Sequence, residues 1–576
     1  MRGIGGWLDY QQDIKQKVSI LQDMAMTVDN YQMYISNHIG LIGVEYEKDD
    51  YIIVFSGELY NKSEINNELG KEIDIDAEVV LEAYLLWGFD AFNKFNGAYA
   101  FSIYNSKTEE LVLVRDHFGI KPLYYYPYDN GIVFGSYLKV LLKNPLVEPI
   151  ITEDGLLQIF MLGPQKILGS GVFKDVKEIF PGQYVVVTKD GCSTKTYYRL
   201  VAKEHTESLD ETKDKIKELL EDSVKRRIEP KMGTMLSGGL DSSVVSSLAN
   251  KYVDSLSSYY IEYKDNDKYF KETLFQPNQD KDYIQIMVDE LKSEHRVITL
   301  NEDDLFDHLY ESMAARDLPG MADIDSSFYV FCKEISKNES VVLSGECSDE
   351  VFGGYPWYYK EEFVWKDSFP WMQSIDVRKQ LVKEGILKNE ESYIWKLYND
   401  TLVKVSYLPS DNIYQRRHRE LFYLNVYWFM QTLMERCERM SSVYSLNVRI
   451  PFCDKRLVEY CYNIPVEMKL LNGSEKGLLK ETMKDILPKE IANRKKSPFP
   501  KTWNPRYFEL LVKRMNEVLQ EDSLFTYVIN KEMVEKIMLN EEEIMWYGQL
   551  MRTPQVIAYL LQVDMWFKEY NVRIEV

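Results

Sequence analysis

A short glycine- and serine-rich segment, residues 237–243, constrains this chain more than any other feature of its sequence. It follows an apolar run at 234–236 that is typical of a strand, and it precedes residues 244–248, which are typical of a helix. Two glycines let the backbone approach an anion, while a helix N-terminus offers aligned N–H groups. The segment therefore predicts a phosphate-binding loop whose contributing residues are Ser237, Gly238, Gly239, Asp241, Ser242 and Ser243.

The residue after the last glycine separates this loop from a Walker-type nucleotide loop, because it is Leu240 where a Walker loop has lysine. Asp241 is an acidic residue inside an anion cradle, an arrangement that is favourable when the carboxylate carries a cation. It is therefore a candidate Mg²⁺ ligand that bridges to phosphates. The alternative is a simple glycine–serine turn without a ligand, which the flanking strand and helix disfavour.

Composition and charge narrow the class of protein. The 576 residues are enough for two domains, and 45% apolar with 28% charged residues is typical of globular proteins. The 69 basic and 91 acidic residues give a net charge of −22, which disfavours binding to nucleic acid or to an anionic membrane. No run of about 18 apolar residues and no export signal is found, so we expect a cytoplasmic protein. The six cysteines and six histidines show no paired metal spacing, so we expect reduced thiols and no zinc site.

The pattern of apolar residues changes along the chain and indicates two domains. The first 200 residues are rich in short strands with few helices, which is typical of an α+β layered domain. A polar segment at 202–211 is a plausible linker, and beyond it strands alternate with helices as in a parallel sheet. The predicted elements are strands at 51–55, 98–103, 110–114, 233–236, 258–262 and 340–343 and helices at 77–87, 421–434 and 556–566.

Six ordered motifs agree on one family. They lie at 237–243, 316–325, 343–356, 448–454, 494–500 and 546–552. With them the chain closely resembles the glutamine-hydrolysing asparagine synthetases of the asparagine synthetase B type, within the pyrophosphate-loop adenylating ligases. The resemblance implies an N-terminal α+β Ntn-hydrolase-like (αββα) glutaminase-like domain at 1–203. It also implies a C-terminal α/β pyrophosphate-loop (adenine nucleotide α-hydrolase-like) synthetase domain with many helices at 204–576.

The resemblance further implies a reaction and its participants. Family members adenylate the side-chain carboxylate of aspartate with ATP and Mg²⁺, release pyrophosphate, and let ammonia displace AMP. Adenylation is needed because a free carboxylate is a poor electrophile, and the charge that develops on pyrophosphate must be stabilised. By resemblance, Asp241 and Asp349 hold Mg²⁺, Lys496 contacts the phosphates, and Glu346 takes the proton that ammonia loses, while Met235, Ile261, Ser344 and Gly345 contact adenine and ribose. The family also suggests a homodimer.

Two structural alternatives accompany these assignments. Asp349 and Glu350 could instead cap a helix that begins near Val351, a role that does not exclude metal binding. Lys495 and Lys496 could be a solvated charge pair, although the flanking residues of the motif favour a functional interpretation.

The N-terminal half departs from the family at its catalytic positions. The family has a nucleophilic cysteine at residue 2, where this chain has Arg2, and no cysteine precedes Cys192. The segments that clamp the glutamine carboxylate and supply an oxyanion donor are replaced by residues 39–42 and 56–58. A guanidinium cannot attack a carboxamide, so we expect a degenerate glutaminase domain. Asp76 could retain amine binding or act as a helix N-cap.

A second departure lies in the synthetase half, where the family's Leu-Glu-x-Arg reads Leu446-Asn447-Val448-Arg449. Asn447 and Arg449 are candidates for the substrate pocket, and loss of the glutamate charge would weaken selection for a free amino acid. An exchange without functional effect is equally consistent with the sequence.

The sequence therefore predicts an AMP-forming carboxylate–amine ligase that takes a small-molecule or peptide carboxylate and free ammonia or an amine. One alternative is a tailoring ligase that amidates or cyclises a metabolite or peptide, as β-lactam synthetases and lasso-peptide cyclases do. Another is a non-catalytic nucleotide-binding regulator, which the intact loop motifs disfavour. A separate glutaminase that supplies the ammonia is compatible with the first hypothesis.

Overall fold

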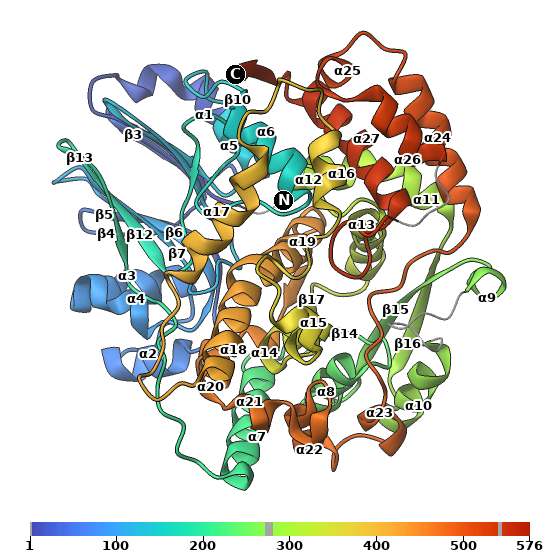
Figure 1. The fold of residues 1–576 in the computed structure, drawn as a ribbon. Coiled ribbons are helices and arrows are strands. Elements are labelled where there is room, and N and C mark those ends of the chain that lie inside the picture. The colour runs from blue at the N-terminus through green and yellow to red at the C-terminus, as the bar shows by residue number, and fades with distance from the viewer. Residues whose placement is uncertain (1–2, 271–279, 540–543, 576) are drawn as a thin grey trace. The chain divides into compact units, whose positions relative to one another are not determined.

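The computed structural model describes residues 3–270, 280–539 and 544–575, and the chain forms two compact units (Figure 1). The first unit takes in the residues up to Gly155 together with 167–199 and 573–575. The second takes in residues 156–166 and 200–572. Residues 156–166 therefore belong to the second unit, although the residues on either side of them in sequence belong to the first. Residues 573–575 belong to the first unit, although the preceding residues belong to the second. The domain limits 1–203 and 204–576 stay a prediction.

The first unit contains two six-stranded sheets. The strand order of one is β11-β8-β9-β1-β3-β2 and that of the other is β13-β12-β7-β6-β5-β4. The first sheet comprises β1 (Gly5–Asp9), β2 (Met33–Ile35), β3 (Ile39–Ile42), β8 (Tyr124–Tyr128), β9 (Gly131–Gly135) and β11 (Lys177–Glu178). The second comprises β4 (Val44–Lys48), β5 (Tyr51–Leu59), β6 (Gly97–Asn105), β7 (Glu110–Arg115), β12 (Gln183–Thr188) and β13 (Gly191–Thr196). The paired neighbours run antiparallel throughout both sheets.

The side chains of β6 point alternately into two apolar cores, which shows how these sheets are layered. Tyr99 and Phe101 belong to an apolar core shared with Phe92 of α4 (Ala91–Lys94) and with α3 (Asp76–Trp87). Ala100 faces the other way, into a core shared with Leu8 of β1. Since successive side chains of a strand point to opposite faces, β6 is covered on both sides. Figure 1 shows α3 and α4 beside the sheet of β5–β7.

The opposite face of the first sheet is covered by α1 (Val18–Met26) and α5 (Leu138–Leu142), which pack against β1, β3 and β9. The layers are therefore helix, sheet, sheet and helix. This confirms the predicted αββα domain, and the expected strands at 51–55, 98–103 and 110–114 are all present.

The turn after β7 is held by one buried carboxylate. Asp116 is fully buried, and its Oδ1 accepts hydrogen bonds of 3.0 Å from the backbone N–H groups of Phe118 and Ile120. Its Oδ2 accepts from the N–H of Lys121 at 2.9 Å and from that of Tyr99 in β6 at 3.3 Å. Burial raises the pKa of Asp116, while these donors act in the opposite direction. The carboxylate thus ties the turn to the centre of the sheet.

We expect Asp116→Ala to loosen this part of the first unit. The change leaves four backbone donors without their acceptor, and each buried donor without a partner costs about 1–3 kcal/mol. Hydrogen–deuterium exchange of peptides from β6 and β7 should accelerate by at least about tenfold. Asp129→Ala, at an exposed turn, is the matched control. Unchanged exchange in β6 of the Asp116 variant would show that the carboxylate does not hold the turn.

The second unit is built on a five-stranded parallel sheet of order β16-β15-β14-β17-β18. Its strands are β14 (Gly233–Met235), β15 (Ser257–Tyr263), β16 (Glu294–Leu300), β17 (Val341–Leu343) and β18 (Asn447–Arg449). The parallel sheet confirms the prediction from alternating strands and helices. β14 is the central strand, with β15 on one side and β17 on the other. Because β14 and β17 are parallel, the loops that follow them leave the same edge of the sheet. That edge is where open α/β sheets bind ligands.

Many helices complete the second unit, as the sequence predicts. Those used below are α7 (Leu209–Lys225), α8 (Leu240–Ala249), α10 (Lys281–Leu291), α14 (Ser348–Phe352), α15 (Glu361–Val364), α18 (Ile413–Leu424), α19 (Met430–Ser442), α20 (Lys455–Asn463), α21 (Val466–Lys469), α22 (Gly477–Met483), α23 (Lys489–Ala492) and α27 (Thr553–Glu569). In the ranges that the structure describes, none of the helices combines the length and apolar character needed to cross a membrane.

Two predicted elements differ in detail. The single helix expected at 421–434 is two helices, because Asn425–Phe429 forms a π-helical turn between α18 and α19. The polar segment at 202–211 is without regular structure only as far as Ser208. There Ser208 caps α7 by accepting from the N–H of Glu211, whose carboxylate accepts from Ser208 in return.

Candidate active site

A cavity of about 190 Å³ opens at the edge of the parallel sheet where β14 and β17 end. Six basic side chains line it, against four acidic ones, although the chain as a whole carries a charge of −22. The basic residues are Arg436, Lys476, Lys480, Arg494, Lys495 and Lys496, and the acidic ones are Asp241, Glu346, Asp349 and Glu475. Positive charge is thus concentrated where a phosphate would need it.

The predicted phosphate loop forms one wall of this cavity. Ser242 Oγ accepts from the Ser237 N–H at 3.2 Å and lies 3.1 Å from Ser237 Oγ, so the two serines close the loop. α8 begins at Leu240 without a side-chain cap, which leaves its first N–H groups directed at the cavity end of the helix. Gly238 has a φ of +66°, and a Cβ there would lie 2.7 Å from the backbone N of Ile284, so only glycine fits.

A second glycine brings the turn after β17 against this loop. A Cβ on Gly345 would lie 2.8 Å from the backbone N of Ser242, a distance that side chains do not tolerate. Ser344 and Gly345 therefore lie next to the start of α8. The close approach of two backbones shapes the cavity between the ends of β14 and β17.

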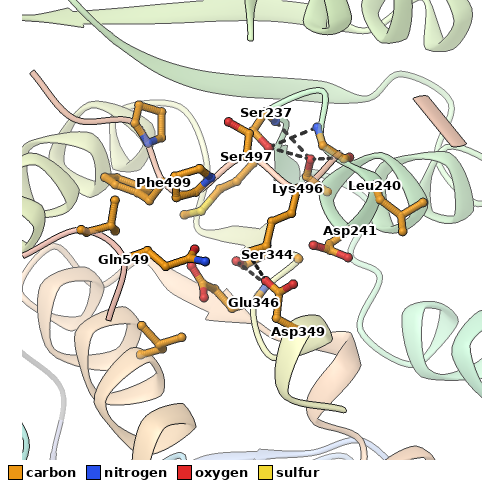
Figure 2. A pocket seen from close by; sticks show the side chains of 18 of the residues that line it. Ser237, Leu240, Asp241, Ser344, Glu346, Asp349, Lys496, Ser497, Phe499 and Gln549 are labelled. Atoms are coloured by element: carbon orange, nitrogen blue, oxygen red, sulfur yellow. Dashed lines mark hydrogen bonds and ion pairs between the residues drawn. The ribbon is translucent and has the colours of Figure 1, made fainter. Parts of the chain in front are cut away.

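An ammonium group joins the two predicted metal ligands. Lys476 Nζ lies 2.7 Å from Asp241 Oδ2 and 2.8 Å from Asp349 Oδ1. Lys496 pairs with the other oxygen of Asp349, and Ser348 Oγ donates to Asp241 Oδ1 at 2.6 Å. Burial opposes ionisation of Asp349, but the two lysines outweigh it and lower the pKa of this carboxyl to about 2. Figure 2 shows Asp241, Glu346 and Asp349 gathered around the end of Lys496.

The donor set of this cluster fits Mg²⁺ in one respect. Asp241 and Asp349 both lie within 2.8 Å of the same Nζ atom, so one cation can contact both carboxylates. Mg²⁺ in phosphate-transfer sites is usually held by one or two carboxylates plus substrate phosphates. Over the described part of the chain, no group of three or more metal-binding side chains is found. The remaining ligands would have to be phosphate oxygens and water.

Glu346 lies beside this cluster in the cavity and is paired with an arginine. Arg436 Nη2 donates to Glu346 Oε1 at 2.6 Å, and the guanidinium lies against the rings of Phe328 and Phe499, 5.3 and 5.1 Å from their centroids. Apart from the neighbouring Cys437 thiol, Arg436 Nε and Nη1 have no hydrogen-bond partner among the described residues. This buried guanidinium can therefore bind a further carboxylate.

The helix that carries Asp349 begins earlier than the capping alternative required. α14 starts at Ser348, and Cys347 occupies the cap position without a side-chain cap. Asp349 lies inside the first turn, where its carboxylate contacts lysines rather than backbone N–H groups. The capping interpretation is therefore wrong, and so is that of a solvated pair for Lys496, whose ammonium is bound to Asp349.

Most of the predicted residues meet in this one cavity. Those that line it are Met235, Ser237, Gly239, Asp241, Ser242, Ile261, Ser344, Gly345, Glu346, Asp349 and Lys496. Gly238 and the buried Ser243 support the loop from behind. Asn447 and Arg449 are not among the lining residues, and Arg449 donates to the Arg227 carbonyl at 2.7 Å and pairs with Glu229 at 2.9 Å. The catalytic roles of all these residues stay predictions.

Four basic residues of the cavity escaped the sequence analysis. Lys476, Lys480 and Arg436 lie outside the six motifs, while Arg494 lies inside one but received no role. Arg494 Nη1 donates to the Ser237 carbonyl at 3.1 Å and so fixes the start of the phosphate loop. The available signal for Arg436 was a charged residue on an otherwise apolar helix stripe, since a buried arginine needs a partner.

Comparison with known proteins agrees with this geometry. The asparagine synthase family profile matches residues 215–568, and that of the glutamine amidotransferase domain matches residues 1–198. The chain belongs to the asparagine synthetase family. It is 36% identical over 614 aligned residues to asparagine synthetase [glutamine-hydrolyzing] 3 of Bacillus subtilis, with 100% of both chains covered.

More distant members of the asparagine synthetase family also match. Asparagine synthetase [glutamine-hydrolyzing] 1 of B. subtilis is 27% identical, covering 90% of this chain and 88% of its own. The asparagine synthetase of Gallus gallus is 23% identical, covering 85% and 80%. A B. subtilis glutamine PRPP amidotransferase structure aligns with a TM-score of 0.25 and 12% identity over 60% of this chain and 81% of its own, too low to inform the fold.

Membership of the asparagine synthetase family defines the type of reaction. The chain is an ATP-dependent amide-forming ligase that amidates an aspartate-like carboxylate with ammonia. The cavity described above, with its phosphate loop, is where the structure offers binding groups for such substrates.

Glu350 provides a pH test of this site. Burial and the neighbouring Asp349 charge raise the pKa of Glu350 to about 8, and Tyr355 Oη donates to its Oε1 at 2.7 Å. The folded state therefore holds a proton that the unfolded chain loses above a pKa of about 4.5. Wild-type stability should fall between pH 4.5 and 8 because of this group, and Glu350→Gln should remove that loss.

The Glu350→Gln experiment compares the melting temperatures of variant and wild type across this range. We expect equal values near pH 4.5 and a more stable variant at pH 8, since glutamine keeps the acceptor for Tyr355. Glu362→Gln, at an exposed position of α15, controls for loss of a carboxylate. A difference that did not grow with pH would mean that Glu350 is ionised in the folded protein.

Proposed function

We propose that this enzyme adenylates the side-chain carboxylate of aspartate, or of a close relative of aspartate, and transfers the acyl group to free ammonia without a glutaminase activity of its own. The observation that supports this most is that one cavity contains both kinds of binding group. Ser237 and the start of α8 offer phosphate-binding groups, while Arg436 and Glu346 offer carboxylate- and amine-directed groups.

The first step joins the substrate carboxylate to the nucleotide. A carboxylate oxygen attacks the α-phosphorus of ATP, the bond to the β-phosphate bridging oxygen breaks, and pyrophosphate leaves with that electron pair. The loop N–H groups and the serine hydroxyls would hold the pyrophosphate. Lys496 and Lys476 place positive charge beside the position where negative charge develops.

The second step forms the amide. The nitrogen of ammonia bonds to the acyl carbon, the carbon–oxygen bond to AMP breaks, and a proton must leave the nitrogen. Glu346 is the carboxylate placed to accept it, and its ion pair with Arg436 fixes the position of its side chain. The unpartnered nitrogens of Arg436 would bind the α-carboxylate of an amino-acid substrate.

Mg²⁺ would be held by Asp241 and Asp349 together with phosphate oxygens. When bound, it supplies charge that neutralises the phosphates. Lys476 contacts both aspartates, so it keeps their carboxylates oriented toward a common point.

Two features of the first unit support the absence of a glutaminase. No cysteine occurs between residues 3 and 191, and Cys192 lies on the exposed strand β13. Asp76, the candidate amine ligand, is already used, since its Oδ2 accepts from the Leu59 N–H at 2.9 Å and its Oδ1 pairs with Lys62 at 3.0 Å. α3 begins at Asp76 itself, so an N-cap role is wrong. Arg2 lies outside the described residues.

Other expectations stay predictions of this proposal. They are a homodimer, a separate protein that supplies ammonia, the absence of nucleic-acid binding, a cytoplasmic location and asparagine biosynthesis as the pathway. No described feature of the cavity favours a tailoring ligase over a ligase that amidates aspartate.

Mass spectrometry of the products tests the proposal directly. Purified protein with MgATP, aspartate and ammonium should form asparagine, AMP and pyrophosphate, and glutamine in place of ammonium should give none. Asp349→Asn removes a charge from the lysine cluster and should lower turnover by about 100-fold. Asp303→Asn, at an exposed ion pair with Arg506, is the matched control. Asparagine formed from glutamine, or none from ammonium, would refute the corresponding part of the proposal.

Glu346→Gln separates the two chemical steps. The amide keeps the size of the side chain but cannot accept the proton from the attacking nitrogen, so amide formation should fall by about 10²–10⁴-fold. Exchange of labelled pyrophosphate into ATP in the presence of aspartate reports the first step alone and should persist. Glu362→Gln should leave both unchanged. Equal loss of exchange and amide formation would assign Glu346 to binding or adenylation instead.

A further inference from the structure

A second cavity of about 250 Å³ lies in the same unit and shares no lining residue with the active-site cavity. Residues of α18, α20 and α21 form much of its wall, and the turn after α14 contributes Gly353. The side chains that matter for its chemistry are Glu204, His205, Asp411, His418, Arg419 and Lys469.

Lys469 places an uncompensated positive charge in this cavity. Its Nζ lies 4.4 Å from the centroid of the Phe422 ring, and no described carboxylate lies within ion-pair distance of it. Burial lowers the pKa of Lys469 to about 7, and the nearby charge of Arg419 acts in the same direction. A cation–π contact recovers only part of the cost of taking an ammonium out of water.

The acidic groups of the cavity are engaged elsewhere. Arg419 Nε donates to Asp411 Oδ2 at 2.8 Å, so that pair is neutral as a whole. Glu204 is exposed at the rim and accepts from Ser410 Oγ at 2.9 Å. Neither carboxylate compensates Lys469, and the interior of the cavity keeps a net positive charge.

His418 adds an unused polar group. Its side chain is 9% exposed, and its Nε2 has no hydrogen-bond partner among the described residues. Burial, with Lys469 and Arg417, lowers the pKa of His418 to about 3, so the ring is neutral and Nε2 can carry a proton and donate it. The ring lies between Tyr414 and Tyr358, whose centroids are 4.6 and 6.4 Å away.

We propose that this second cavity is a binding site for a small anion, a phosphate or a carboxylate, held by the ammonium of Lys469 and by Nε2 of His418. Such an anion would supply both the missing counter-charge and the missing hydrogen-bond acceptor. A buried unpaired charge and a buried unpaired donor at one cavity are each unfavourable alone, and a single anion satisfies both.

The site lies close to α14, so an anion bound there is placed to influence the active-site cavity. Gly353 directly follows α14, the helix that carries Asp349. Tyr358, which also lines the cavity and stacks on His418, donates from its Oη to the Glu350 carbonyl at 2.9 Å. An anion beside His418 therefore lies one side chain away from the backbone that positions a residue of the active site.

Lys469→Met is the decisive variant. Below pH 7 the wild type holds the ammonium charged in a partly buried place, whereas above about pH 10.5 the group is neutral in both folded and unfolded states. Methionine removes this penalty, so the variant should melt at a higher temperature than the wild type at pH 6.5, and the difference should vanish as the pH rises through 10.5. The variant is therefore expected to fold.

Binding is measured by NMR of histidine labelled with ¹³C at Cε1, since the chain has only six histidines. Inorganic phosphate and succinate are titrated separately at pH 6.5, and His418→Gln assigns the critical signal. We expect His418 and His205 to shift with at least one probe, while the four histidines outside both cavities stay still. Which probe acts tells a phosphate site from a carboxylate site.

The shifts should disappear in Lys469→Met and persist in Lys489→Met, at an exposed position of α23. No shift with either probe, equal shifts of all six signals, or an unchanged titration in Lys469→Met would overturn the proposal. The readout does not involve turnover, so its outcome is independent of the proposed function.

Discussion

The contact of Lys476 with two aspartates is the interaction on which the candidate active site depends. Asp241 comes from the first turn of α8 and Asp349 from that of α14, two helices that follow neighbouring strands of the sheet. Two carboxylates so close to one point repel each other strongly at the low dielectric of a buried site. The ammonium of Lys476, itself 2% exposed, makes their proximity favourable and thereby fixes the two loops relative to each other.

The same cluster shows how a strongly acidic protein concentrates positive charge in one cavity. The net charge of −22 acts over the whole surface and is screened by salt, whereas the lysines and arginines of the cavity act within a few ångströms. Local geometry therefore decides what the cavity binds. The second cavity follows the same rule with fewer groups, since one ammonium defines its charge and one neutral imidazole offers a hydrogen bond.

The fold of the first unit rests on packing and on buried hydrogen bonds. Its two sheets are held by alternating apolar residues on both faces of strands such as β6 and by the buried carboxylate of Asp116. None of these depends on a nucleophile or on a carboxylate clamp. A domain of this fold can thus keep its layers whether or not it acts on glutamine.

The sequence alone determined the family, the layered first domain, the parallel sheet and eleven of the residues that line the cavity. It could do so because glycine spacing and apolar periodicity are local patterns. Gly238 and the alternation of side chains along β6 can be recognised without a structure. The sequence did not reveal the roles of Lys476, Arg436, Lys469 and His418. Each of these roles depends on contacts between side chains that are far apart in the chain. Only tertiary packing decided that Lys476 lies between Asp241 and Asp349, and that Lys469 has no carboxylate beside it in the described structure, since the pairing of buried charges is set by three-dimensional distance.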